Sequence, residues 1–115
     1  MSSLDTPLSQ SRAVGDLVFV SGQIGVDADG KVPAEFRRQA ELAMAALRET
    51  LEAAGSALEK VVKTTVFITS AADFATMNEV YRSFFSEPWP VRSTVVSGLV
   101  LPDLLFEIEA VASAT

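Results

Sequence analysis

The alternation of apolar and polar positions predicts a chain that begins with two strands and a helix. Residues 12–24, RAVGDLVFVSGQI, form two β-favouring runs with a turn at Gly15 and Asp16. From Pro33 to Ala54 apolar residues recur at three- and four-residue steps, which predicts an amphipathic helix. Gly55 follows as a C-terminal cap.

The second half of the chain repeats this alternation of strand and helix. Residues 61–69 are rich in β-branched side chains and predict a strand, and Ser70 is placed to cap a second helix with an aromatic apolar stripe. A pair of prolines ends this helix. Two further strands are expected, at residues 90–98 and 104–112.

This order of elements, β-β-α-β-α-β-β, predicts a two-layer α+β fold in which both helices cover one face of a mixed sheet. In the last strand Phe106, Ile108 and Ala110 share one face. Val111 adds an apolar side chain to the opposite face, so both faces need cover. We therefore expect a single domain over residues 1–115 that buries its second sheet face in a homo-oligomer.

The composition excludes several kinds of chemistry. The chain has no cysteine and no histidine, so it lacks a thiol nucleophile, a Cys-based zinc site and a Ser-His-Asp triad. A net charge of −6 disfavours nucleic acid as a partner, because phosphate backbones attract basic surfaces. Neither a membrane-spanning run nor a signal-peptide pattern is present, so we expect a cytoplasmic protein.

Arg92 is a permanent cation inside an otherwise apolar predicted strand. Its planar guanidinium fits a carboxylate with two hydrogen bonds, so it could bind an anionic substrate. The alternatives are a structural ion pair with Glu107 or Glu109, or simple exposure to solvent. Periodicity alone favours these alternatives.

Other polar residues also allow two interpretations each. Glu107 and Glu109 are typical of a solvent-facing strand face, but a buried glutamate could have a raised pKa and orient a water. The pair Ser21-Gly22 indicates either a bulge, which is favoured, or a close approach of the backbone to a ligand. Asn78 could reach a pocket from the second helix, although a surface amide is the commoner outcome.

Five segments in order resemble the reactive intermediate deaminase family, the Rid or YjgF-type proteins once described as L-PSP endoribonucleases or translation inhibitors. The segments are LVFVSGQI, VVKTTVFIT, DFATMNEVYRSFF, PVRSTV and FEIEAVA. The resemblance spans residues 7–112. It implies a chorismate-mutase-like α+β fold of the bacillus type, assembled as a homotrimer with pockets between subunits. It also implies hydrolysis of 2-imino acids, such as 2-iminopropanoate and 2-iminobutanoate, to 2-oxo acids and ammonia, without cofactor or metal.

By position, the resemblance implies that Arg92 clamps the substrate carboxylate and that Glu107 orients or activates the attacking water. The other pocket positions that it implies are Ser21, Gly22, Asn78, Phe84, Thr94 and Leu8. Leu8 and Thr94 stand where the family commonly has tyrosine and cysteine. Because Leu8 makes the pocket more apolar, a different preferred imine and a weak activity both stay open. Trp89 is expected near the pocket entrance.

An alternative function keeps the same fold and the same arginine. The chain would then be a non-catalytic module that binds small carboxylates or has a regulatory role. The older description as a ribonuclease or translation inhibitor is disfavoured by the acidic charge and the missing histidine.

Overall fold

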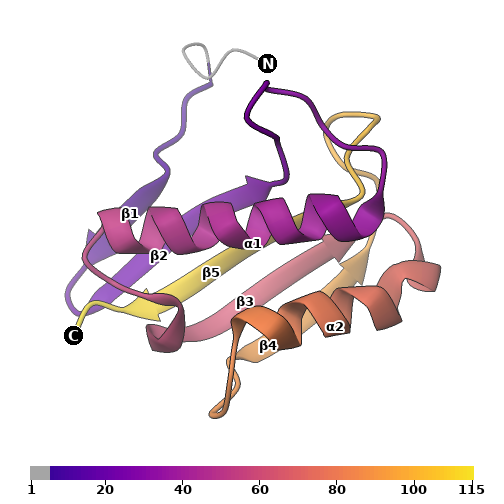
Figure 1. Ribbon diagram of the computed structural model, residues 1–115. Coiled ribbons are helices and arrows are strands. Elements are labelled where there is room, and N and C mark those ends of the chain that lie inside the picture. The colour runs from indigo at the N-terminus through magenta and orange to yellow at the C-terminus, as the bar shows by residue number, and fades with distance from the viewer. Residues whose placement is uncertain (1–5) are drawn as a thin grey trace.

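The computed structural model describes residues 6–115 and confirms the predicted order of strands and helices (Figure 1). The elements are β1 (Ser11–Val14), β2 (Leu17–Ile24), α1 (Phe36–Ala53), the 3-10 turn η2 (Leu58–Lys60), β3 (Val61–Ile68), the 3-10 turn η3 (Ala71–Asp73), α2 (Phe74–Phe84), β4 (Val91–Val96) and β5 (Phe106–Ser113).

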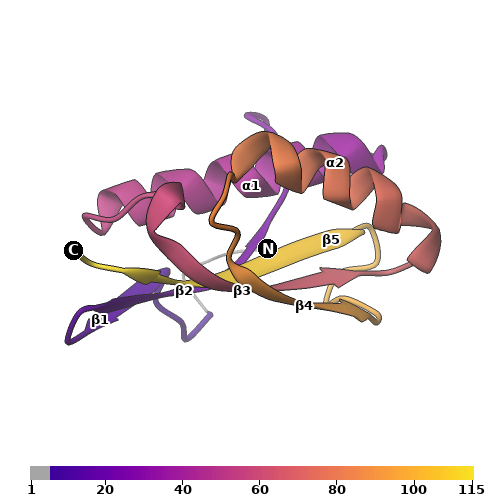
Figure 2. The same cartoon turned by 90° about the horizontal axis from the view of Figure 1, so that it is seen from below.

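The five strands form one mixed sheet in the order β1-β2-β5-β3-β4. Strands β3 and β4 run parallel, and the other neighbouring pairs are antiparallel. Both helices lie on one side of the sheet and leave its other face uncovered (Figure 2). The predicted two-layer α+β architecture is therefore confirmed.

The core lies between the helices and the sheet. The buried face of α1 combines small and large side chains, so that Ala40 and Ala43 let the helix approach the sheet while Leu47 and Leu51 fill the space between them. At the start of this helix Phe36 packs edge-to-face on Phe106 of β5, with ring centroids 6.0 Å apart. Neither helix in residues 6–115 is long and apolar enough to cross a bilayer.

The buried side chain of Gln39 explains two boundaries that the sequence pattern placed wrongly. Its amide donates hydrogen bonds to the carbonyls of Pro33 and Asp103, and its Oε1 accepts one from the N–H of Leu105 at 2.8 Å. These bonds occupy backbone groups just before the helix and just before the last strand. Helix α1 consequently begins at Phe36 rather than three residues earlier, and β5 begins after Leu105.

The second helix also begins later than predicted. The hydroxyl of Ser70 accepts a hydrogen bond from the N–H of Ala72 at 3.2 Å, as a capping residue does. The turn that it caps is η3, and regular α-helix follows only from Phe74.

The uncovered face of the sheet carries large apolar side chains. Leu17 and Phe19 of β2 are 41% and 44% exposed, and Val91 and Val95 of β4 are 68% and 38% exposed. Phe19 is in register with Val111 of β5, so these side chains lie over several neighbouring strands. An apolar surface of this kind is typical of an interaction site.

Candidate functional site

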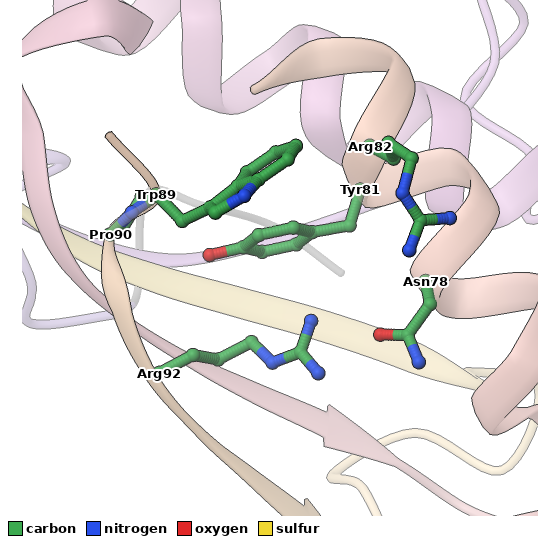
Figure 3. Close-up of a pocket in the computed structure, with 6 residues that line it drawn as sticks. All are labelled: Asn78, Tyr81, Arg82, Trp89, Pro90 and Arg92. Carbon is green, nitrogen blue, oxygen red and sulfur yellow. The ribbon is translucent and has the colours of Figure 1, made fainter. Parts of the chain in front are cut away.

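A cavity of about 430 Å³ lies between α2 and the beginning of β4 (Figure 3). Small-molecule sites commonly enclose about 300–1,000 Å³. Its walls come from one helix and from the segment that follows it, and they combine two aromatic rings with two cations and an amide. The lining residues are Asn78, Tyr81, Arg82, Trp89, Pro90 and Arg92.

Arg92 lies in this cavity with aromatic rings beside it. Its Cζ atom is 4.8 Å from the ring centroid of Tyr81 and 5.8 Å from that of Phe74. Stacking of this kind holds the guanidinium plane and leaves its N–H edges available to a ligand. Within residues 6–115 no carboxylate forms an ion pair with it, so the expected alternative of a structural pair with Glu107 or Glu109 is not found there.

A hydrogen bond to the sheet fixes the side chain of Tyr81. Its hydroxyl and that of Thr64 on β3 form a buried hydrogen bond of 2.8 Å. Burial raises the pKa of Tyr81, although that bond and the charge of Arg92 act in the opposite direction. A neutral tyrosine therefore gives Arg92 a fixed aromatic surface. Asn78, one helical turn earlier, points its amide toward Arg92 (Figure 3).

Glu107 belongs to a second group of expected site residues. A Cβ atom built on Gly22 would lie 2.0 Å from Oε2 of Glu107, so the carboxylate fills the space that the glycine leaves open. The register between β2 and β5 shifts between Val20 and Gln23, which is the bulge that the sequence favoured at this place. The group that approaches the glycine is the carboxylate of β5.

Partial burial raises the pKa of Glu107, and the nearby charge of Glu109 raises it further. A carboxyl group of this kind accepts and returns a proton nearer to neutral pH than an exposed glutamate does. In the described part of the chain, no three acidic side chains are grouped closely enough to hold a metal ion.

The N-terminal segment runs beside the same bulge. The hydroxyl of Ser21 donates to the carbonyl of Ser9, and the N–H of Ser21 donates to the carbonyl of Gln10 at 2.9 Å. These bonds place Leu8, which is 54% exposed, at the end of a segment fixed next to Ser21 and Gly22.

The two groups of residues lie on opposite faces of one sheet. Arg92 is in register with Thr64, and Thr64 is in register with Ala110; both of these partners are buried beneath the helices. Glu107 is in register with Phe67, on the uncovered face. Because cross-strand partners share a face, the side chains of Arg92 and Glu107 leave the sheet in opposite directions. One chain alone does not bring them together.

The two remaining residues that were expected in the site, Thr94 and Phe84, lie in different places. Thr94 is half-buried and follows Arg92 on the same face of β4. Phe84 is not among the residues that line the Arg92 cavity; it lines a neighbouring one and lies under the guanidinium of Arg48, whose Cζ is 5.5 Å from the ring centroid.

Sequence reasoning missed three residues of the cavity, of which Pro90 was considered only as the end of the second helix. Tyr81 was assigned to the apolar stripe of the second helix, and Arg82 was not singled out. Their spacing from Asn78, three and four residues along a helix, was the signal that could have found them.

Comparisons with known proteins agree with this architecture. The model of the family described as Endoribonuclease L-PSP matches residues 3–114. TdcF of Escherichia coli (strain K12), assigned by name to the reactive intermediate deaminases, is 42% identical over 110 residues, which cover 92% of this chain and 85% of TdcF. The 2-iminobutanoate/2-iminopropanoate deaminase of the same strain is 39% identical over 110 residues, with 92% and 86% covered.

Solved structures give the same result. RidA from Psychrobacter sp. PAMC 21119 is 35% identical and superposes with a TM-score of 0.89, covering 95% of this chain and 89% of its own. E. coli TdcF with bound serine is 38% identical, with a TM-score of 0.86 and the same coverage. The chain therefore belongs to the Endoribonuclease L-PSP family, which includes the reactive intermediate deaminases RidA and TdcF.

Proposed function

We propose that this protein hydrolyses 2-imino acids to 2-oxo acids and ammonia, in sites formed between copies of the chain. Relatives named as reactive intermediate deaminases support this class of reaction. The observation that carries the proposal is Arg92, a half-buried guanidinium stacked on Tyr81 with no ion-pair partner among residues 6–115. Such a group is suited to the carboxylate of a small substrate.

Arg92 binds the carboxylate of the substrate and so fixes the substrate in the cavity. Hydrogen bonds between a guanidinium and a carboxylate contribute about 1.5–3 kcal/mol each. The chain as a whole has a net charge of −6 and repels anions, so the attraction must be local. Arg92 supplies it from the cavity.

Glu107 acts on the water. In its ionised form it accepts a proton from a water molecule as the oxygen attacks the carbon of the C=N bond. The electron pair of the C=N bond moves to the nitrogen, which takes this proton back from Glu107 and gives a carbinolamine. Glu107 then transfers the proton of the new hydroxyl group to the nitrogen; the C=O bond forms as the C–N bond breaks, and the products are ammonia and a 2-oxo acid. The raised pKa of Glu107 supports this role, since proton transfer by a well-placed group contributes about 10²–10⁴-fold to a rate.

A second copy of the chain supplies the missing half of each site. Arg92 and Glu107 leave opposite faces of the sheet, and the face that carries Glu107 is uncovered and apolar. A closed ring of copies would cover that face and bring Glu107 of one chain toward Arg92 of its neighbour. The resemblance in sequence implies three copies, and we propose that homotrimer.

The test generates 2-imino acids in situ with an amino-acid oxidase and traps the surviving imine with semicarbazide. We expect the protein to accelerate imine loss and Arg92→Ala to abolish the acceleration. Arg48→Ala removes a stacked arginine outside the Arg92 cavity and should behave like the unmodified protein. Unchanged imine survival with alanine-, 2-aminobutyrate-, leucine- and phenylalanine-derived imines, and also with glutamate- and aspartate-derived imines, would refute the proposal.

A second candidate function is binding of small carboxylates without turnover. The exposed Leu8, next to the Ser21-Gly22 bulge, offers no hydroxyl that could position a substrate or water. For this function, a 2-oxo acid would raise the melting temperature in an Arg92-dependent manner while the imine assay showed no acceleration. Cleavage of RNA is not proposed, because the chain is acidic and has no histidine.

A further inference from the structure

We infer that the cavity selects 2-imino acids whose side chain ends in a second carboxylate, and that Arg82 binds this second group. This inference rests on the proposed function and goes beyond it by naming the substrate class. It starts from the presence of two arginines, rather than one, in the wall of the cavity.

The two arginines reach the cavity from different elements. Arg92 comes from β4, and Arg82 comes from the last turn of α2, four residues after Asn78. In Figure 3 both guanidinium groups and the amide of Asn78 point toward the same space. An elongated molecule with an anionic group at each end fits this arrangement.

Arg82 does not pair with Glu79, the acidic residue of its own helix. Glu79 lies three residues before it, which is the spacing at which opposite charges pair on a helix surface. Glu79 is instead paired with Arg37 of α1. In residues 6–115, neither Arg82 nor Arg92 has a carboxylate at ion-pair distance.

A cavity with two such cations favours a dianion. A monocarboxylate that binds Arg92 leaves Arg82 unneutralised, while a second carboxylate at the other end of the ligand pairs with it. The two arginines also differ in setting: Arg92 is stacked on aromatic rings and half-buried, whereas Arg82 is exposed. We therefore assign the carboxylate next to the imine carbon to Arg92 and the distal carboxylate to Arg82.

The experiment compares kcat/KM for imines derived from glutamate and aspartate with those derived from 2-aminobutyrate and leucine. Oxidases of matching specificity generate each imine. Arg82→Gln removes the second cation and keeps a good helix-forming residue. Arg48→Gln, which changes the net charge equally but lies outside the lining, is the matched control.

We expect the unmodified protein to prefer the acidic imines. Arg82→Gln should lower the ratio of acidic to neutral kcat/KM about tenfold, which corresponds to the loss of one charge-assisted contact in a partly exposed place. Arg48→Gln should leave the ratio unchanged. A binding assay accompanies the kinetics: 2-oxoglutarate should raise the melting temperature more than 2-oxobutanoate, and Arg82→Gln should remove the difference.

The outcomes separate this inference from the proposed function. If all imines are hydrolysed and Arg82→Gln leaves the ratio unchanged, the inference is wrong and the deaminase remains. If no imine is hydrolysed but 2-oxoglutarate binds in an Arg82-dependent manner, the deaminase is wrong and the second carboxylate site stands. An equal drop in Arg48→Gln would attribute the preference to net charge and overturn the inference.

Discussion

Gly22 and Glu107 depend on each other, although they are distant in the sequence. The Gly22→Ala substitution would place a methyl group 2.0 Å from Oε2 of Glu107. Because the end of that side chain can rotate away, we expect a small change in the free energy of unfolding. We expect a loss of activity of about 10²-fold, since the displaced carboxylate no longer meets the water.

A double-mutant comparison checks this prediction. In a Glu107→Gln background, Gly22→Ala should cause little further loss of activity, because the group that it displaces is already inactive. Gly98→Ala is the control, since a Cβ atom at Gly98 has no neighbour within 4 Å. Fully additive losses would show that Gly22 acts independently of Glu107.

Glu107 itself should weaken the fold at neutral pH. Its pKa is raised in the folded chain by burial, so the folded state holds this proton more tightly than the unfolded state does. Stability is therefore lost as the pH rises from the ordinary glutamate pKa, about 4.5, through the raised one. Glu107→Gln removes this effect and should melt at a higher temperature than the unmodified protein at pH 7.

Melting curves from pH 3 to pH 8 measure this difference. The difference in melting temperature should vanish near pH 3, where Glu107 is protonated in both the folded and the unfolded state. In the imine assay Glu107→Gln should be about 10²-fold slower. If Glu107→Gln melted at a lower temperature than the unmodified protein at neutral pH, ionised Glu107 would not destabilise the fold and the prediction would be wrong.

At the level of single residues, the pattern singled out Arg92 and Glu107 as candidates, and the resemblance added Asn78 and Trp89, which line the Arg92 cavity, but neither indicated Tyr81 or Arg82. A cation inside an apolar strand is visible in the pattern itself. Tyr81 looks like a core residue and Arg82 looks like a solvated helix position, and each of these descriptions is locally correct. Their common cavity arises from the segment that brings Trp89 back to α2, which no local pattern encodes.

Helix α2 carries half of the cavity, and Tyr81 ties it to the sheet. We predict that Tyr81→Phe destabilises the fold by about 1–3 kcal/mol, because the buried hydroxyl of Thr64 loses its partner. The phenylalanine ring still stacks on Arg92, so KM for a 2-imino acid should change little. Chemical denaturation and steady-state kinetics measure the two effects.

The double variant Thr64→Val with Tyr81→Phe removes both hydroxyl groups. It should regain most of the lost stability, since no buried polar group is then left unpaired. A double variant as unstable as the sum of the single ones would mean that the hydrogen bond is not what holds α2 in place.

The order of the elements was predictable because apolar periodicity is local, whereas their ends were not. The boundaries of α1 and β5 depend on Gln39, whose side chain hydrogen-bonds to backbone groups before the helix and before the last strand. The pattern of apolar and polar residues describes one segment at a time, so it does not reveal a hydrogen bond between a side chain and a distant segment. The strand order, with β5 between β2 and β3, likewise depends on contacts distant in the sequence.

At the scale of the whole molecule, the sheet separates the proposed site into two halves. The Arg92 half lies with the helices, and the Glu107 half lies on the uncovered apolar face. The sequence predicted apolar residues on both strand faces and hence an oligomer, but it did not predict that the two charged residues would diverge. That result follows from the register of β3, β4 and β5, and it makes the oligomer a requirement of the proposed mechanism.

Mixing two inactive variants tests this requirement directly. Arg92→Ala and Glu107→Gln each lack one half of every site, so each should be nearly inactive alone. Refolded together in equal amounts, they form mixed rings in which half of the chains carry Arg92 and half of the neighbours carry Glu107. About a quarter of the sites are then complete, whatever the number of copies in the closed ring. We expect the mixture to recover about a quarter of the unmodified activity per chain, measured by imine trapping after size-exclusion chromatography. A site built within one chain would show no recovery, because every chain in the mixture lacks one of the two residues.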